Sequence, residues 1–157
     1  MNKLRIILDE ENFQISQLNS VSSGFYVQID NFSFPSEQWI DLSVSIVEMW
    51  LAVVNKHLLY AQNDSVLNFM EGDYEIRLRR ETNYCSFAFF VEPNGSISHS
   101  TTIDSLYLAR QLLSVSSKTM KLLQEHTTTY HMKKLEELTS ALRTTVHKLS
   151  KAKNNSR

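Results

Sequence analysis

The residues able to carry acid–base or metal chemistry are few, and their spacing forms no catalytic pattern. They are five histidines and one cysteine: His57, His99, His126, His131, His147 and Cys85. His126 and His131 are five residues apart, whereas two metal ligands on one face of a helix are usually four apart. A single cysteine cannot supply the thiolate cluster of a zinc site. We therefore expect surface histidines, no bound metal and no other cofactor.

Cys85 could be paired with a distant histidine as a nucleophile and its base. Its neighbours argue against that role. Every second position along residues 85–92 carries an apolar side chain: Cys85, Phe87, Phe89 and Val91. This alternation predicts a strand whose shared face is buried, so the thiol is expected in the core and unreactive. The same face is too apolar for an exposed platform on which nucleic-acid bases could stack.

Three carboxylates recur at alternate positions, and they are Glu71, Asp73 and Glu75. Arg77 and Arg79 continue the same face of the strand predicted over residues 73–80. An exposed, salt-bridged strand explains this pattern better than a catalytic carboxylate pair. The three glycines are isolated and cannot form a phosphate-binding loop. We therefore predict that the chain is not an enzyme, and we assign the three carboxylates as candidate partner-binding residues.

The longest strongly periodic segment before the C-terminal third covers residues 34–62, and residues 36–62 of it are predicted as a helix. Ser36 is a candidate N-cap for a helix over this range. Apolar side chains, Trp50 among them, cover most of the predicted helix circumference, whereas a surface helix needs only one apolar stripe. The helix is therefore expected to be central, with a sheet on one side and a second helix or another chain on the other.

Residues 73–80, 85–92 and 96–103 each show the two-residue alternation of a half-buried strand. The sequence Pro-Asn-Gly at residues 93–95 predicts a tight hairpin turn, because Asn-Gly tolerates positive φ angles. Together the three segments predict an antiparallel meander. The serines and threonines of residues 96–103 predict that this last strand is an exposed edge.

Two further helices follow. Asp104 is a candidate N-cap for a helix over residues 105–126. The three threonines at residues 127–129 predict a break, because β-branched side chains lose rotamer freedom in a helix. From Lys133 onward the leucines follow a heptad-like pattern, which predicts an amphipathic third helix.

The predicted fold class is α+β: an antiparallel meander sheet packed on a long central helix, with a C-terminal helical segment. Residues 1–126 form the α+β body. Residues 127–157 form a basic amphipathic helix that belongs to the same domain or extends from it. A length of 157 residues suits one domain with a substantial core.

The formal net charge of -1 conceals an uneven distribution. Residues 133–157 contain seven basic and two acidic residues, whereas the preceding residues carry a net charge of -6. An acidic body suits a basic partner, and a sequence pI near 6.5 makes nucleic acid an unlikely one. The N-terminus lacks the apolar core of a signal peptide, and no apolar run approaches eighteen residues. We therefore expect a cytoplasmic protein with no membrane partner.

Two stretches resemble a known class of protein. FPSEQWID at residues 34–41 leads into the helix that contains Trp50, and FMEGDYEI follows at residues 69–76. Over residues 34–78 the chain resembles small bacterial cytosolic immunity-type proteins of polymorphic or contact-dependent toxin systems. The resemblance implies a non-catalytic protein that neutralises a toxin by direct binding. The acidic body fits this role, since nuclease toxins tend to be basic and would be attracted electrostatically.

A second interpretation is a self-associating structural or regulatory module of a phage or mobile element. The wide apolar surface of the central helix and the heptad-like third helix exceed what one small sheet covers, which predicts a homodimer. A toxin gene beside the gene for this chain would favour the first interpretation.

Overall fold

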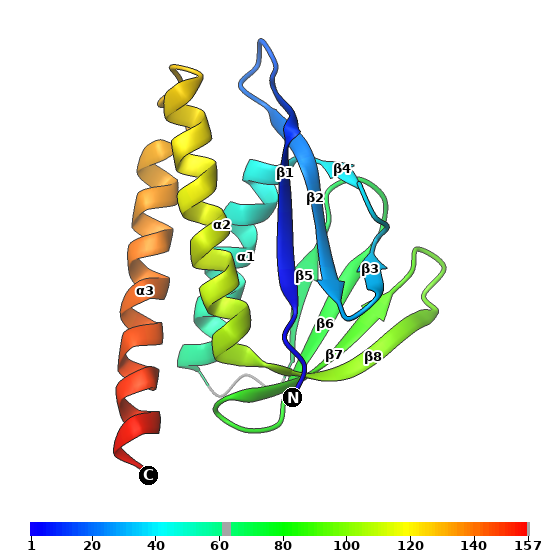
Figure 1. Ribbon diagram of the computed structural model, residues 1–157, viewed down its shortest axis with the longest axis vertical. Helices are drawn as coiled ribbons and strands as arrows, with labels where there is room; N and C mark the ends of the chain where they lie inside the picture. The colour runs from blue at the N-terminus through cyan, green and yellow to red at the C-terminus, as the bar shows by residue number, and fades with distance from the viewer. Residues whose placement is uncertain (61–63, 157) are drawn as a thin grey trace.

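The computed structural model describes residues 1–60 and 64–156. These residues form an α+β fold with two antiparallel sheets and three helices (Figure 1). The elements follow one another as β1 (Arg5–Ile15), β2 (Val21–Ile29), β3 (Phe32–Phe34), β4 (Ile40–Asp41), α1 (Ser43–Leu59), β5 (Asp64–Asn68), β6 (Glu75–Arg80), β7 (Cys85–Val91), β8 (Ile97–Asp104), α2 (Ser105–Glu125) and α3 (Met132–Asn155). The fold class predicted from the sequence is confirmed.

The two sheets divide the strands by their position in the chain. The N-terminal sheet has the order β1-β2-β3, with β4 also paired to β2. The meander sheet has the order β5-β6-β7-β8, so its strands are neighbours in both sequence and space. The three strands predicted after residue 72 are therefore confirmed, together with the turn at residues 93–95, where Gly95 has a φ of 85°. Strand β5 was not predicted, because its Val66 and Leu67 form only a short apolar run.

Helix α1 lies between the sheets and the other two helices. It contacts β2 and β5 on one side and α2 and α3 on the other. Trp50, at the middle of α1, is fully buried, and its indole Nε1 donates a 2.8 Å hydrogen bond to the carbonyl of Asn68. The long central helix predicted from the sequence fits this arrangement only loosely, since α1 is shorter than predicted and lies between sheets and helices of its own chain.

The predicted start of this helix at Ser36 is wrong. Helix α1 begins at Ser43, and the segment before it turns instead, with the Trp39 amide donating to the Ser36 carbonyl. Gln38 has a φ of 63°, which a right-handed helix cannot contain. The predicted end is also too late, because α1 stops at Leu59; residues 61–63 lie outside the described chain.

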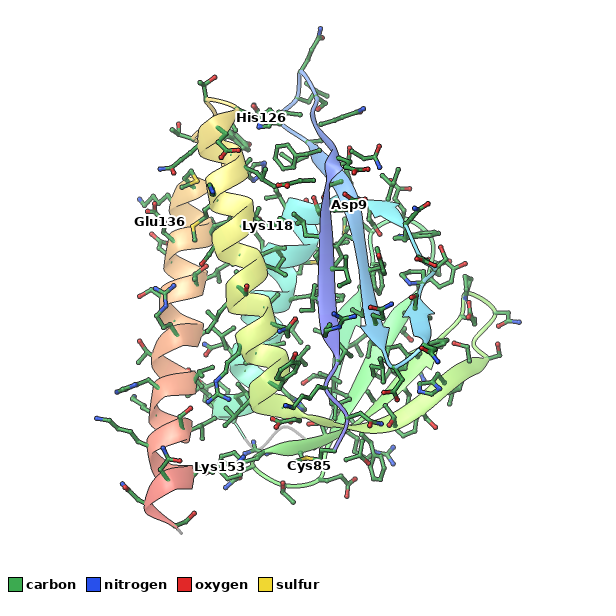
Figure 2. All side chains as sticks on the ribbon, in the orientation of Figure 1. Asp9, Cys85, Lys118, His126, Glu136 and Lys153 are labelled. Carbon is green, nitrogen blue, oxygen red and sulfur yellow. The ribbon has the colours of Figure 1, made fainter. Side chains whose placement is uncertain are left out.

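Helix α2 begins where its sequence predicts, because the Asp104 carboxylate accepts a 3.0 Å hydrogen bond from the Tyr107 amide. This helix also covers β1: the Lys118 ammonium group donates to the Leu8 carbonyl at 2.9 Å, and Figure 2 shows Lys118 on the side of α2 nearest β1. Thr127 has a φ of 55°, so the chain leaves the helix at the predicted break.

Helix α3 returns beside α2 and packs against both α1 and α2 (Figure 1). Its apolar positions Leu135 and Leu142 are fully buried there. The Thr145 hydroxyl also reaches the side-chain oxygen of Asn55 on α1. The C-terminal helix therefore covers its own body. Within the described chain, no helix is long and apolar enough to cross a membrane.

Replacing Trp50 with alanine should destabilise the protein by about 3–5 kcal/mol, out of a total near 5–15 kcal/mol, because it leaves a cavity and an unpaired Asn68 carbonyl. Urea unfolding would measure the loss. Tyr130→Ala is the matched control, since Tyr130 is 70% exposed and its removal should change the free energy of unfolding little. An unchanged midpoint for Trp50→Ala would show that α1 is not the centre of the core.

Candidate functional site: the outer face of the meander sheet

The meander sheet has one buried face and one exposed face. Its inner face carries Leu67, Ile76, Ala88 and Phe90, which are all fully buried against the rest of the protein. We call the opposite side the outer face. By strand register it consists of Asp64, Val66, Asn68, Glu75, Arg77, Arg79, Phe87, Phe89, Val91, Ile97, Ser100 and Thr102, of which Val91 is buried.

The predicted facing of β7 is wrong. Phe87 and Phe89 lie on the outer face, and Phe87 is 38% exposed, while Ala88 and Phe90 point into the core. Cys85 is half-buried on the same side of β7, beyond the twelve residues of the outer face. In β6 the predicted alternation is confirmed, with Ile76 and Leu78 buried and Arg77 exposed. The sequence-based objection to an exposed aromatic surface therefore does not hold for this strand.

The strand register places these side chains in three rows across the sheet. One row is Asp64, Arg79, Phe87 and Thr102; the next is Val66, Arg77, Phe89 and Ser100; the third is Asn68, Glu75, Val91 and Ile97. Side chains directly opposite on neighbouring strands are close enough to contact one another. The arginines of β6 thus stand beside the phenylalanines of β7.

Three hollows open on this side of the protein and share their lining. The first has a volume of about 320 Å³ and includes Val66, Arg79 and Phe89. The second shares Arg77 and Val91 with the first and extends to the turns that precede β6 and β8. The third shares Arg79 and Phe89 with the first and includes Phe87. The outer face is therefore one continuous, uneven surface.

The arginines of the outer face already have partners within the chain. An Arg77 guanidinium nitrogen lies 2.6 Å from the Glu75 carboxylate, and an Arg79 nitrogen lies 3.5 Å from that of Asp64. Arg79 also lies over the Phe89 ring, 5.7 Å from its centroid. The two arginine side chains remain 57% and 60% exposed, so these exposed ion pairs hold the groups loosely.

The three predicted partner-binding residues lie at one end of the outer face, but they do not share a strand. Only Glu75 belongs to β6, and it is paired with Arg77. Glu71 and Asp73 are exposed in the turn that precedes β6. Asp73, Glu75 and Glu92 line the second hollow, whereas Glu71 does not. The structure therefore brings two of the three residues together and adds Glu92, which the sequence analysis did not single out.

A buried carboxylate holds this acidic turn in place. Asp41 is 1% exposed and accepts hydrogen bonds from the amides of Met70 and Glu71, at 3.2 and 3.0 Å. It also accepts from the Trp39 indole and the Leu42 amide. With four donors around it, this carboxylate has a structural role that fixes the turn against the start of α1.

The expectation that every histidine lies at the surface is wrong for His57, which is only 2% exposed. Its ring nitrogens each lie 2.9 Å from a hydroxyl, those of Ser65 and Ser86, and Ser86 is 2.9 Å from the Ser105 hydroxyl. Burial lowers the pKa of His57, and the nearby Arg80 guanidinium lowers it further. All three serines are buried, so this histidine–serine chain has no nucleophile that a substrate could reach.

His131 also has internal partners. Its ring nitrogens lie 3.1 Å from the Glu48 carboxylate on α1 and 2.8 Å from the Asn19 carbonyl between β1 and β2. The Lys134 ammonium group approaches the same carboxylate at 3.4 Å. These contacts tie the connection between α2 and α3 to two other parts of the fold, which is a structural role.

Cys85 is half-buried on the outer side of β7, close to the sheet end shown in Figure 2. Partial burial raises the pKa of its thiol, and the nearby Glu81 carboxylate raises it further. A raised pKa leaves little of the reactive thiolate at neutral pH. Among residues 1–60 and 64–156, no group of three or more His, Cys, Asp and Glu side chains is arranged to hold a metal ion.

In comparisons with known proteins, no family model, no curated protein and no solved structure matches this chain. A functional assignment therefore has to come from the geometry of the chain itself.

His57 should make the protein less stable in acid. The fold favours its neutral ring, so this contribution is complete above the ordinary histidine pKa near 6.5 and is lost as pH falls from there toward the lowered folded value. The free energy of unfolding should fall by at most about 1.4 kcal/mol per pH unit from this group. Urea unfolding between neutral and mildly acidic pH would measure the slope.

Two variants separate His57 from the other histidines. His57→Asn should lower stability at neutral pH and reduce the loss on acidification. His147→Asn, at an exposed position, should leave the slope as it is in the natural chain. Equal slopes in all three proteins would mean that His57 does not contribute to the acid sensitivity.

Proposed function

We propose that the chain is a non-catalytic protein-binding domain whose partner packs on the outer face of the meander sheet. The observation behind this proposal is the composition of that face. It presents two arginines, two phenylalanines and Ile97, which is 56% exposed, and no lysine stands among its twelve residues. Protein–protein interfaces are enriched in arginine and aromatic residues and depleted in lysine, and arginine is frequent at positions that dominate binding energy.

The charge of the outer face favours a protein partner over a nucleic acid. The four charged side chains of the face form two opposite pairs, so the face has no net charge to attract a phosphate backbone. The acidic turn with Glu71 and Asp73 would repel phosphates at one end. Mixed charge beside apolar side chains is instead the usual character of a protein interface.

The area of the outer face indicates how far such an interface would extend. Four strands about 4.8 Å apart and three rows about 6.8 Å apart cover roughly 400 Å², whereas a typical interface covers about 800 Å² on each partner. Contact is therefore expected to continue beyond the strands onto the acidic turn. In this arrangement the apolar side chains of the outer face provide the buried centre, and Glu71, Asp73 and Glu75 form a charged rim.

The more specific form of the proposal concerns the partner, a toxin domain that the chain neutralises by binding. Its support is the immunity-type resemblance of residues 34–78 and the acidic rim, which suits a basic toxin. The chain would act by covering the toxin surface, and no chemical step is required of it.

The proposed homodimer needs an interface other than the helices. The expectation rested on apolar surface of the central and third helices that one small sheet would leave uncovered, but α1 and α3 pack on each other and on further elements of their own chain. An interface between two copies would therefore have to use another part of the surface.

Removing the aromatic side chains of the outer face should weaken binding strongly. We expect Phe87→Ser with Phe89→Ser to reduce affinity for the toxin domain encoded beside the gene at least about tenfold, because buried aromatic side chains dominate interface energies. Calorimetric titration would measure affinity, and thermal melting would check that the variant is folded.

The matched control removes two exposed apolar side chains elsewhere. Leu18→Ser with Tyr130→Ser alters side chains that are 88% and 70% exposed and lie off the meander sheet, so it should bind as the natural chain does. Equal affinity of both double variants would reject the outer face. If no toxin domain is encoded nearby, the toxin form of the proposal fails, while protein binding by this face does not.

The acidic rim should act mainly on the rate of association. Reversing charge at Glu71, Asp73 and Glu75 with lysine should slow association with a basic toxin domain and make it less sensitive to salt, because rim charges steer the encounter more than they hold the complex. Stopped-flow binding at several salt concentrations would show this.

The control for net charge is the same reversal at Glu125, Glu136 and Glu137. These residues are exposed on α2 and α3, so the control matches the total charge change without touching the rim. An association rate that falls equally in both triple variants would attribute the effect to overall charge, and the rim would have no specific part.

A further inference from the structure

Strand β8 is the last strand of the meander sheet, and hydrogen bonds to Asn2 show which of its backbone groups point to the free edge. The Asn2 amide donates to the Thr102 carbonyl at 3.0 Å, and the Asp104 amide donates to the Asn2 carbonyl at 3.1 Å. The backbone groups of Thr102 and Asp104 therefore point away from β7. Because these groups alternate along a strand, those of Ser100 point the same way.

The N-terminal segment pairs with only one end of this edge. Asn2 forms a parallel bridge with Ile103, and among the described backbone hydrogen bonds outside the ladders none reaches Ser100. From Ile97 to Thr101 the edge therefore has backbone donors and acceptors directed to the outside. Ser98 and Ser100 are exposed.

The side chains of β8 give its edge little protection. Residues 97–103 contain no lysine, no other formally charged residue and no proline, which are the usual means of blocking an edge strand. A register shift between Phe90 and Val91 adds a bulge at the Ile97 end. At the other end the Thr102 carbonyl already accepts from the Asn2 amide, so regular pairing is limited to the stretch from about His99 to the Thr102 amide. This edge can pair with another strand over a short length.

We propose that the free edge of β8 pairs antiparallel with the same edge of a second copy of the chain. A two-fold axis places one strand against its own equivalent, so each copy supplies donors and acceptors in equal number. The absence of charge on residues 97–103 means that no like charges meet across the seam. The two segments with Asn2 then lie at opposite ends of the seam.

This pairing would also complete the candidate binding surface. Ile97, Ser100 and Thr102 belong both to β8 and to the outer face. Joining two β8 strands places two outer faces side by side in one eight-stranded sheet, which raises the surface from roughly 400 to about 800 Å², the usual size for one side of an interface. The proposed dimer does not depend on the proposed function. The use of the joined surface for binding a partner rests on that function.

Sedimentation of the natural chain tests the dimer directly. Because few backbone hydrogen bonds form the seam, we expect a weak, concentration-dependent dimer with a dissociation constant in the micromolar range, on the order of 1–100 µM. A chain that remains monomeric at several hundred micromolar would overturn the proposal.

Two substitutions at one position locate the seam. Ser100→Pro removes an outward N–H group that β7 does not use, and it should raise the dissociation constant at least about tenfold, since the donor is lost twice in each dimer. Ser100→Ala removes the same hydroxyl but keeps the N–H group, so it should dimerise like the natural chain. A full-strength dimer of Ser100→Pro would reject β8 as the interface.

Hydrogen exchange on the natural chain gives an answer that does not depend on how well the proline variant folds. The outward amides of Ser100 and Thr102 should exchange more slowly at high protein concentration than at low concentration. Amides within the β6–β7 ladder should not respond in this way. Exchange at Ser100 and Thr102 that does not change with concentration would overturn the proposal.

Toxin binding is measured separately, so the two proposals can fail independently. A Ser100→Pro monomer that binds the toxin domain normally would leave the dimer standing and show that one outer face is sufficient.

Discussion

The structure depends on the need to cover α1 on all sides. Its apolar side chains occupy most of the helix surface, and Trp50 at its middle is fully buried. Both sheets contribute to one covering layer, and α2 and α3 form the other. Because the inner face of the meander sheet is used in this layer, its outer face remains at the surface. The position of the candidate site thus follows from the burial of one helix.

The buried polar groups strengthen the same arrangement. Asp41 holds the turn before β6 against the start of α1 through four hydrogen bonds. His57 connects α1 to β5 and β7, and Ser86 continues the chain of bonds to Ser105 on α2. A buried polar group without a partner costs about 1–3 kcal/mol, so each of these bonds favours one relative placement of the layers. Their roles are structural, so the candidate functional residues are those at the surface.

At the surface, three features adjoin one another. The outer face has arginines beside phenylalanines, the turn with Glu71 and Asp73 lies at one end, and the free edge of β8 lies along one side. A partner on the outer face and a second copy at the edge would touch different parts of the same sheet. The two contacts are therefore geometrically compatible, and one could enlarge the surface available to the other.

Local chemistry determined much of this fold. The Asp104 side chain caps α2, Asn-Gly forms the turn before β8, and the alternation of Ile76 and Leu78 with arginines orients β6. These features depend on contacts within a few residues, so the sequence alone predicts them. The start of α1 was mispredicted because residues 36–42 have the periodicity of a helix but form a turn and a short strand, in which the Trp39 carbonyl accepts from the Phe25 amide of β2.

The facing of β7 was decided only by the tertiary structure. Its two sides are both apolar, with Phe87 and Phe89 on one and Ala88 and Phe90 on the other, so alternation cannot show which is buried. The inner side is the one that meets α2 and the N-terminal sheet, where Phe90 packs on Phe32. The aromatic part of the candidate surface was therefore missed from the sequence, because the exposure of Phe87 and Phe89 depends on which layer covers the other side of β7.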